Sequence, residues 1–248
     1  MLMTLYEVVR LLAEPFLPVL QGRVRRDLVC LLKETPARPA RVLDVGGRKS
    51  PYTVGLPCTI TVMDLPRTSE TQELLQLGLT TEILADLQRR RSNVQEVVLQ
   101  DITKCTLPSS SFDGVVSVEV IEHVHDDEAF VSQIAGVLKP GGWLYLTTPN
   151  GDYIRNEPPN YNPDHVRHYT RQALSDLLSR HFNNVSVSYG VKTGKYRYNG
   201  LESMDYRRPI LMLKTMISNL INRVESRGLN NEQSRTAHLF AAALKESP

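Results

Sequence analysis

The sequence has no long uninterrupted apolar run, and its charges nearly cancel. A transmembrane helix needs roughly 18 or more apolar residues in succession, and no segment of this chain comes close to that length. The 29 basic and 27 acidic residues leave a net charge of +2, which is too small for a strong field that would attract nucleic acid or an anionic membrane. These absences favour a soluble protein, and neither a membrane nor nucleic acid is expected as a partner, although a local basic patch remains open.

Cysteine is also scarce, and the chain has no metal-binding cysteine spacing. The three cysteines are Cys30, Cys58 and Cys105. A sparse and odd number suits a reducing compartment better than a disulfide framework, so we expect ordinary buried thiols. Near the N-terminus, Glu7, Arg10 and Glu14 interrupt the apolar residues before a signal-peptide core of adequate length forms. These features predict a cytoplasmic protein.

Short apolar runs that end at an acidic residue recur in the first half of the chain. The runs at 41–45, 59–63 and 94–99 carry or precede Asp44, Asp64 and Asp101. Further strands are predicted at 114–118, 143–148, 185–189 and 239–244, and helical periodicity is seen at 3–33, 69–91, 130–138, 174–182 and 210–224. Alternating strands and helices predict a doubly wound parallel sheet with a ligand site at the carboxyl ends of its strands.

Four other segments carry interpretations of their own. The basic cluster Arg89 to Arg91 is interpreted as a solvated helix end rather than a nucleic-acid patch. The polar loop at 150–169 is a candidate lid, and 192–208 is expected to be irregular. The amphipathic helix at 210–224 is expected to dock its apolar face on the fold, with a partner or membrane surface as the alternatives.

The first strand leads into a glycine turn that suggests a bound nucleoside. Gly46 and Gly47 follow the strand, and Asp64 stands 20 residues after Asp44. Glycines let a ligand approach the backbone, and an acidic residue at the next strand end can accept from both ribose hydroxyls. The dinucleotide fingerprint requires a third spaced glycine, whereas this chain continues with Arg48, Lys49 and Ser50. The turn therefore gives little support to a pyrophosphate cradle.

Six motifs in order carry a family resemblance. They are LDVGGRKSPY, VMDLP, LQDI, SSSFDGVVSVEVIEHV, LKPGGWLYLTTPN and DHVRHYT. Over about residues 41–182 the sequence resembles class I S-adenosylmethionine-dependent methyltransferases, and in particular the ubiquinone-type small-molecule enzymes. The resemblance implies S-adenosylmethionine as cofactor and a Rossmann-like α/β fold. Its mostly parallel seven-stranded sheet would have the order 3-2-1-4-5-7-6, an antiparallel last strand and helical cap additions.

The whole chain is predicted to be a single methyltransferase domain, 1–248. Within it, residues 1–35 would form an N-terminal helical cap and 36–190 the cofactor-binding core. Residues 191–235 would form a helical insertion that belongs to the cap, and 236–248 the final strand.

The resemblance also assigns the cofactor contacts. Asp44 and Gly46 would support the methionine end, Asp64 would hold the ribose, and Glu119 would lie beside the methionine portion. Asp101 and Ile102 would contact adenine. The family usually has further glycines where this chain has Arg48 and Ser50, so the loop must take a different path. The remaining cofactor-binding predictions are Gly47, which would absorb the backbone strain, Leu65, and Arg48, which would either pair with the cofactor carboxylate or face solvent.

A second cluster, EVIEHV, places acidic and imidazole groups after the fourth strand. Separations of three and four residues bring Glu119, Glu122 and His123 together if a helical turn begins there. Glu122 and His123, with His165 from the lid, are the predicted catalytic residues, because a hydroxyl acceptor must lose a proton. No metal is predicted. The alternative is a divalent-metal site of Glu119, Glu122, His123 and His165, since small-RNA 3′-terminal 2′-O-methyltransferases look similar in this segment.

These patterns lead to one functional hypothesis and two alternatives. The hypothesis is transfer of a methyl group from S-adenosylmethionine to a small molecule, at oxygen. The alternatives are a metal-assisted RNA ribose 2′-O-methyltransferase and a catalytically inactive cofactor-binding partner subunit. A homodimer is left open, and the identity of the acceptor is not encoded in a recognisable motif.

Overall fold

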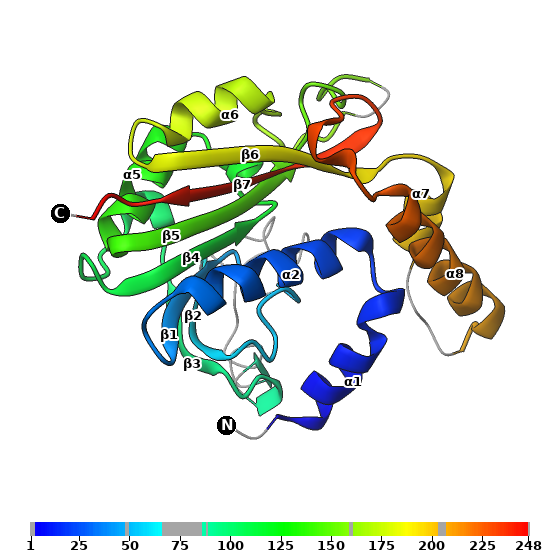
Figure 1. Cartoon of the computed structure of the whole chain (residues 1–248), viewed down its shortest axis with the longest axis horizontal. Helices are drawn as coiled ribbons and strands as arrows, with labels where there is room; N and C mark the ends of the chain where they lie inside the picture. Colours follow the sequence, from blue (N-terminus) through cyan, green and yellow to red (C-terminus); the bar gives the residue numbers. More distant parts are fainter. Residues whose placement is uncertain are drawn as a thin grey trace.

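The computed structural model of the chain describes residues 3–47, 50–65, 86–87, 89–158, 161–202 and 207–247. One seven-stranded sheet organises the molecule, in the order β3-β2-β1-β4-β5-β7-β6 (Figure 1). The strands are β1 (Ala40–Val45), β2 (Cys58–Asp64), β3 (Val94–Leu99), β4 (Phe112–Val118), β5 (Leu138–Pro149), β6 (Asn183–Lys192) and β7 (Thr236–Leu244). The strands from β3 to β5 are parallel, and β7 is antiparallel to both of its neighbours. The predicted topology is confirmed.

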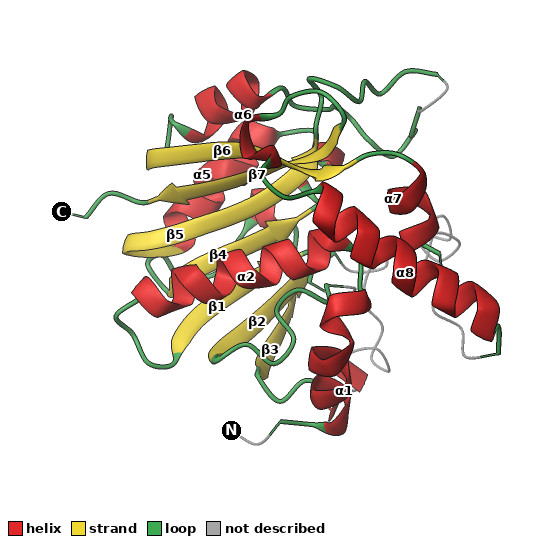
Figure 2. Cartoon of the chain, turned by 45° about the vertical axis from the view of Figure 1, so that its right-hand side comes forward, coloured by secondary structure: helices red, strands yellow, loops and turns green. Residues whose placement is uncertain are grey.

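Two hydrophobic cores form on opposite faces of the sheet. The helices α5 (Asp127–Val137) and α6 (Arg171–Leu178) cover one face, where Phe130 and Leu174 are fully buried. The helix α2 (Val19–Glu34) crosses the other face, where Leu28 packs in a cluster with Trp143. Figure 2 shows α2 on the near side of the sheet with α5 and α6 behind it. Because both faces are covered, β1 and β4 consist almost entirely of buried residues, as apolar central strands require.

The N-terminal segment forms the two helices that its periodicity predicts. These are α1 (Leu5–Ala13) and α2, joined by the 3₁₀ helix η1 (Glu14–Phe16). Thr4 and Glu7 close a capping box at the start of α1. The buried Glu7 carboxylate also accepts hydrogen bonds from the backbone and hydroxyl of Ser92, so α1 is tied to the segment that enters β3. Leu5 and Leu12 of α1 remain largely exposed.

The orientation of α8 (Pro209–Glu225) contradicts the expected docking of its apolar face. Its buried residues are Thr215, Ser218, Asn219 and Asn222. The apolar side chains of Ile210, Leu213, Ile217, Leu220 and Val224 are exposed instead. The buried face is polar because its side chains bond to backbone carbonyls that would otherwise lack donors: Asn219 Nδ2 donates to Phe16 O and Gly200 O, and Asn222 Nδ2 donates to Lys192 O.

The segment at 192–208 is more regular than expected. It contains the short helix α7 (Lys195–Gly200), which packs beside α8 at one end of the molecule (Figures 1 and 2). Gly194, with φ +115, makes the turn into α7, a backbone conformation that a side chain would disfavour. Three other short 3₁₀ helices are described: η2 (Ile102–Lys104), η3 (Ile121–His123) and η4 (Leu229–Asn231).

Two interpretations of single residues were wrong. Arg89 and Arg90 are solvated and pair with Asp86, but Arg91 is only 3% exposed and contacts Asp44. Of the cysteines, Cys58 is buried as expected, whereas Cys30 is exposed and Cys105 is half-buried. Most of the helix predicted at 69–91 lies outside the described residues. No helix in the described part of the chain is long and apolar enough to cross a membrane.

Candidate active site

The carboxyl ends of four adjacent strands bring the predicted cofactor residues to one edge of the sheet. Gly46 N donates to Met63 O at 2.8 Å, which joins the loop after β1 to the end of β2. Gln100 N donates to Asp64 O at 3.1 Å, which joins the end of β2 to the loop after β3. The residues gathered along this edge are Asp44, Gly46, Gly47, Asp64, Leu65, Asp101, Ile102 and Glu119. Arg48 lies outside the described residues.

The turn after β1 depends on its two glycines for different reasons. Gly46 has φ +72, and a Cβ there would lie 2.6 Å from Val120 Cγ2. A Cβ on Gly47 would lie 2.7 Å from Asp44 O. The left-handed conformation therefore falls on Gly46 and not on Gly47, which corrects the expectation that Gly47 absorbs the strain. Both glycines are therefore required by close packing against Val120 and Asp44.

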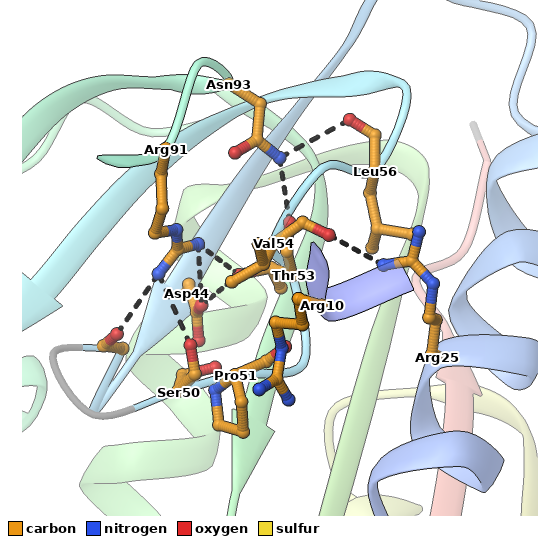
Figure 3. A network of polar contacts seen from close by, with 11 residues as sticks. Arg10, Arg25, Asp44, Ser50, Pro51, Thr53, Val54, Leu56, Arg91 and Asn93 are labelled. Atoms are coloured by element: carbon orange, nitrogen blue, oxygen red, sulfur yellow. Dashed lines mark hydrogen bonds and ion pairs between the residues drawn. The ribbon is translucent and has the colours of Figure 1, made fainter. Parts of the chain in front are cut away.

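The Asp44 side chain is buried and contacts Thr53 and Arg91 beside the turn after β1, and it does not point into solvent (Figure 3). Its carboxylate is 1% exposed and accepts a 2.5 Å hydrogen bond from the Thr53 hydroxyl. Arg91 Nη2 lies 3.8 Å from the same Asp44 oxygen and donates to Thr53 Oγ1. Burial raises the pKa of Asp44, and the Arg91 guanidinium and the Thr53 hydroxyl oppose that rise. This network ties the described residues on the two sides of the turn, 46–47 and 50–54, to Asp44 and Arg91.

The next two acidic residues face the edge from β2 and β3. Asp64 is half-buried, and its Oδ1 accepts from the backbone N–H of the exposed Leu65. Asp101 Oδ1 accepts from the backbone N–H and the hydroxyl of Thr103 at 2.9 and 2.8 Å, which caps η2 and buries Ile102. Asp44 and Asp64 are close enough for the Asp64 charge to raise the pKa of Asp44. The acidic strand ends therefore share one region.

Glu119 belongs to a network that the sequence did not reveal. It adopts φ +55 directly after β4. Its Oε1 accepts from Thr147 Oγ1 at 2.8 Å, and its Oε2 lies 3.0 Å from His238 Nδ1. Burial raises the pKa of Glu119, but His238 and Thr147 more than offset this and hold it below its usual range. Arg197 Nη2 lies 3.2 Å from His238 Nε2, so His238 lies between Arg197 of α7 and Glu119 at the end of β4.

A small cavity adjoins His238 and Arg197. Its volume is about 110 Å³, and it lies between the start of α2, α7, α8 and β7. Arg197, His238 and Tyr52 form part of its polar lining, and Val19, Leu20 and Val191 contribute to its apolar lining. No motif pointed to His238 or Arg197, because they lie far along the chain. The pairing of His238 with Pro149 across β5 and β7 brings the histidine to the edge.

The segment at 161–169, part of the candidate lid, brings His165 to the predicted Glu-His cluster. One ligand atom each from Glu122, His123 and His165 lies within 4.8 Å of the other two. The rings of His123 and His165 meet edge to face, with centroids 4.7 Å apart. Val166 N donates to Glu122 O at 2.7 Å, so the lid is fastened to η3 at this point. Glu119 is not part of this cluster, since its carboxylate contacts Thr147 and His238 instead.

Hydrogen bonds fix the imidazoles of His123 and His165 so that one ring nitrogen of each is free to accept a proton or bind a metal. His123 Nδ1 lies 2.8 Å from Asp164 O, and a carbonyl can only accept, so Nδ1 carries the proton. The same reasoning gives His168 Nδ1 a proton, which it donates to Ile154 O, and leaves His168 Nε2 to accept from His165 Nδ1 at 2.7 Å. The Nε2 atoms of His123 and His165 then carry lone pairs, as a general base or a metal ligand requires.

The electrostatics of the cluster favour a neutral His165. Burial lowers the pKa of His165, and the neighbouring His123 and His168 lower it further. Burial raises the pKa of Glu122 well above its usual range, and the charge of Glu119 adds to the effect. Glu122 is 1% exposed, and its Oε2 accepts from the Thr148 hydroxyl at 3.1 Å. A cation or a proton at this position would offset the cost of burying the carboxylate.

The donor set is compatible with a metal ion. One carboxylate and two imidazoles suit zinc or a transition metal better than magnesium, which prefers oxygen ligands. The buried Glu122 carboxylate, once deprotonated, and the imidazole lone pairs of His123 and His165 are ligands of the kind such an ion takes. Glu122, His123 and His165 would hold it.

Comparison with known proteins places the fold and the motifs together. A methyltransferase-domain family matches residues 20–187. The ubiquinone biosynthesis O-methyltransferase of Paracidovorax citrulli is 30% identical over 69% of this chain and 76% of its own length. A protein of Mycolicibacterium smegmatis described as a probable S-adenosylmethionine-dependent methyltransferase is 34% identical over 43% of this chain. The match spans 40% of that relative, and 31% of each of two similarly described Mycobacterium tuberculosis proteins.

Solved structures agree on the fold. A Haemonchus contortus phosphoethanolamine N-methyltransferase in complex with S-adenosylmethionine aligns with a TM-score of 0.56 and 16% identity, over 90% of this chain and 53% of that one. The 4+2 cyclase SpnF aligns with a TM-score of 0.54 and 17% identity, over 90% and 81%. At such identities the likeness concerns the fold alone. With the matching family model and the acidic strand ends at one edge of this sheet, the chain belongs to the class I S-adenosylmethionine-dependent methyltransferases.

Proposed function

We propose that the chain transfers a methyl group from S-adenosylmethionine to a small-molecule acceptor, at an oxygen atom. The observation that carries the proposal is the pair of imidazole Nε2 lone pairs, on His123 and His165, at the end of β4. A hydroxyl acceptor needs a base, whereas a neutral amine does not. The O-methyltransferase from Paracidovorax citrulli, similar over most of its length, supports oxygen as the acceptor atom.

The chemistry is an in-line displacement. The acceptor oxygen forms a bond to the methyl carbon, the carbon–sulfur bond breaks, and its electron pair remains on the sulfur. His165 Nε2 takes the hydroxyl proton, and the chain His165–His168–Ile154 O keeps that nitrogen unprotonated beforehand. His123 orients the His165 ring through their edge-to-face contact. The protein otherwise contributes alignment and the exclusion of water.

The acceptor atom can be tested with labelled cofactor. The protein is incubated with methyl-labelled S-adenosylmethionine and a panel of phenols, aliphatic alcohols and primary amines, and the products are identified by mass spectrometry. We expect methylated oxygen, and we expect His165→Gln to lower kcat by about a hundredfold or more without changing the affinity for S-adenosylhomocysteine. His181→Gln is the control, because His181 pairs with Glu128 between α5 and α6, away from the cluster.

Two outcomes would contradict this assignment. Exclusive methylation of amines would remove the need for a base. A His165→Gln variant as active as the His181→Gln control would show that the lid histidine takes no part. In the wild type, activity should rise with pH, and the midpoint of the rise should lie below the ordinary histidine pKa, because burial lowers the pKa of His165.

A metal-assisted form of the same reaction is the second candidate, favoured by the grouping of Glu122, His123 and His165. A bound ion would lower the pKa of the acceptor hydroxyl and hold it in place. This form would also serve an RNA ribose hydroxyl, the alternative acceptor. Metal analysis after dialysis, followed by titration with Zn²⁺, Mn²⁺ and Mg²⁺, separates the two. A stoichiometric ion that is lost in Glu122→Gln and retained in the His181→Gln control would establish it.

A further inference from the structure

A second and larger cavity is lined by arginines. It has a volume of about 420 Å³ and lies between α2, the end of β6 and the turn that follows α8. Arg23 and Arg26 reach it from α2, Arg223 from α8, and Arg227 from the turn, with Asp27 as the acidic lining residue. It shares Val19 and Val191 with the cavity beside Arg197, but none of the predicted cofactor residues lines it.

Two glycines leave room for two of these arginines. A Cβ on Gly22 of α2 would lie 2.6 Å from Arg223 Nη1. A Cβ on Gly190 of β6 would collide with Arg23 Nη1. Glycine is unfavourable within a helix relative to alanine. Gly22 nevertheless stands in α2, where it leaves room for the Arg223 guanidinium. The arginine positions are thus built into the backbone of α2 and β6.

The positive charge in this cavity exceeds the negative charge. Asp27 Oδ2 lies 3.5 Å from Arg23 Nε, and its Oδ1 lies 4.0 Å from Arg26 Nε, so one carboxylate serves two guanidinium groups. Arg223 donates to the backbone oxygen of Glu14 at 2.9 Å, and its Nε is buried without a hydrogen-bond partner. Within the described ranges, no carboxylate lies within 4 Å of Arg223 or Arg227.

Burial and like charge both act on Arg223. Burial lowers its pKa, the charge of Glu14 opposes this, and the nearby charge of Arg26 lowers it further. An arginine stays protonated under these conditions, so an anion in the cavity would reduce the repulsion between Arg26 and Arg223. Arg223 Nε is also a buried donor without a hydrogen-bond partner, which is unfavourable.

We propose that this cavity binds the phosphate group of a small phosphorylated molecule. Guanidinium groups match phosphate oxygens with paired N–H donors. Arg23 already donates to Tyr189 O and Ser188 Oγ, so Arg26, Arg223 and Arg227 would supply the bonds to the ligand. A phosphate carries about −1.5 to −2 charges at neutral pH, which suits these three cations better than a single carboxylate ligand would. The volume lies within the range of about 300–1,000 Å³ typical of small-molecule sites. This proposal does not depend on the acceptor assigned above.

Isothermal titration calorimetry of the full chain tests the site with three probes: inorganic pyrophosphate, uridine monophosphate and a short single-stranded RNA. The first variant is Arg26→Met with Arg227→Met, since both side chains are exposed and their loss leaves the fold intact. The second is Gly22→Ala, which displaces Arg223 while favouring the helix. Arg180→Met is the control, because Arg180 pairs with Glu128 elsewhere.

We expect saturable binding of pyrophosphate and of the nucleotide. Both site variants should weaken it by about tenfold or more, since each removes charge-assisted hydrogen bonds to the phosphate. The Arg180→Met control should bind like the wild type, and the affinity for S-adenosylhomocysteine should be unchanged in all variants. Absence of saturable pyrophosphate binding, or an equal loss in the control, would overturn the proposal. Binding of RNA alone would show a charged surface instead of a small-ligand cavity.

Discussion

The contact between Arg91 and Asp44 should contribute more to stability than any exposed ion pair of this protein. Arg91 is 3% exposed and Asp44 is 1% exposed, and Thr53 bridges them (Figure 3). Replacing Arg91 with methionine leaves a buried carboxylate without its cation, which typically costs about 3–5 kcal/mol. The free energy of unfolding of a protein is usually about 5–15 kcal/mol in total, so the variant should lose a large fraction of its stability. Arg89→Met, at a site 74% exposed, should lose about 0.5 kcal/mol or less.

Urea unfolding followed by circular dichroism measures both losses, and a double-mutant cycle isolates the pair. Asp44→Asn removes the charge while its side-chain oxygen can still accept from Thr53. The double variant Asp44→Asn with Arg91→Met should therefore lose clearly less than the sum of the two single losses. If Arg91→Met were no less stable than Arg89→Met, or if the cycle were additive, the buried pair would not be the contact that stabilises the segment at 50–54.

Two further predictions concern α8 and the lid. Asn219→Ala should lower the free energy of unfolding in urea by about 1–3 kcal/mol, because the Asn219 amide donates to two backbone oxygens. Ile210→Ser, at an 86% exposed position, should change it by about 0.5 kcal/mol or less. The reverse order would contradict the described orientation of α8. Burial raises the pKa of Asp127, but Tyr169 and Arg167 outweigh it and hold the pKa below its ordinary value. Its stabilising contribution is therefore fully present above that ordinary value and is lost as the pH falls through the lowered pKa, so Asp127→Asn should flatten the acid limb of stability against pH.

The sheet could be predicted from the sequence because its strands are short apolar runs with clear ends. Buried parallel strands require such runs on both faces, and the glycine turn with Asp44 and Asp64 fixes which ends lie together. The face of α8 could not be predicted in the same way. Periodicity identifies an apolar stripe but not the side on which the fold lies, and here Asn219 and Asn222 satisfy buried carbonyls.

In the candidate site too, some residues could be predicted from the sequence and others could not. Glu122 and His123 are neighbours in the chain, and His165 lies in a loop that returns over them, so local spacing was informative. His238, Arg197 and Arg91 reach the site through strand pairing and helix packing over long sequence separations. A basic run such as 89–91 gives no sign that its last member is buried, because that depends on where β3 begins.

The central claim is that the carboxyl ends of β1, β2 and β3 seat the adenosine of the cofactor. Calorimetric titration of S-adenosylhomocysteine into the wild type and the Asp64→Ala variant tests it most directly, with Asp176→Ala on the exposed face of α6 as control. Loss of a carboxylate that accepts from ribose hydroxyls should weaken binding by about tenfold to hundredfold, and the control should match the wild type. Equal affinity of Asp64→Ala and the wild type would contradict the account.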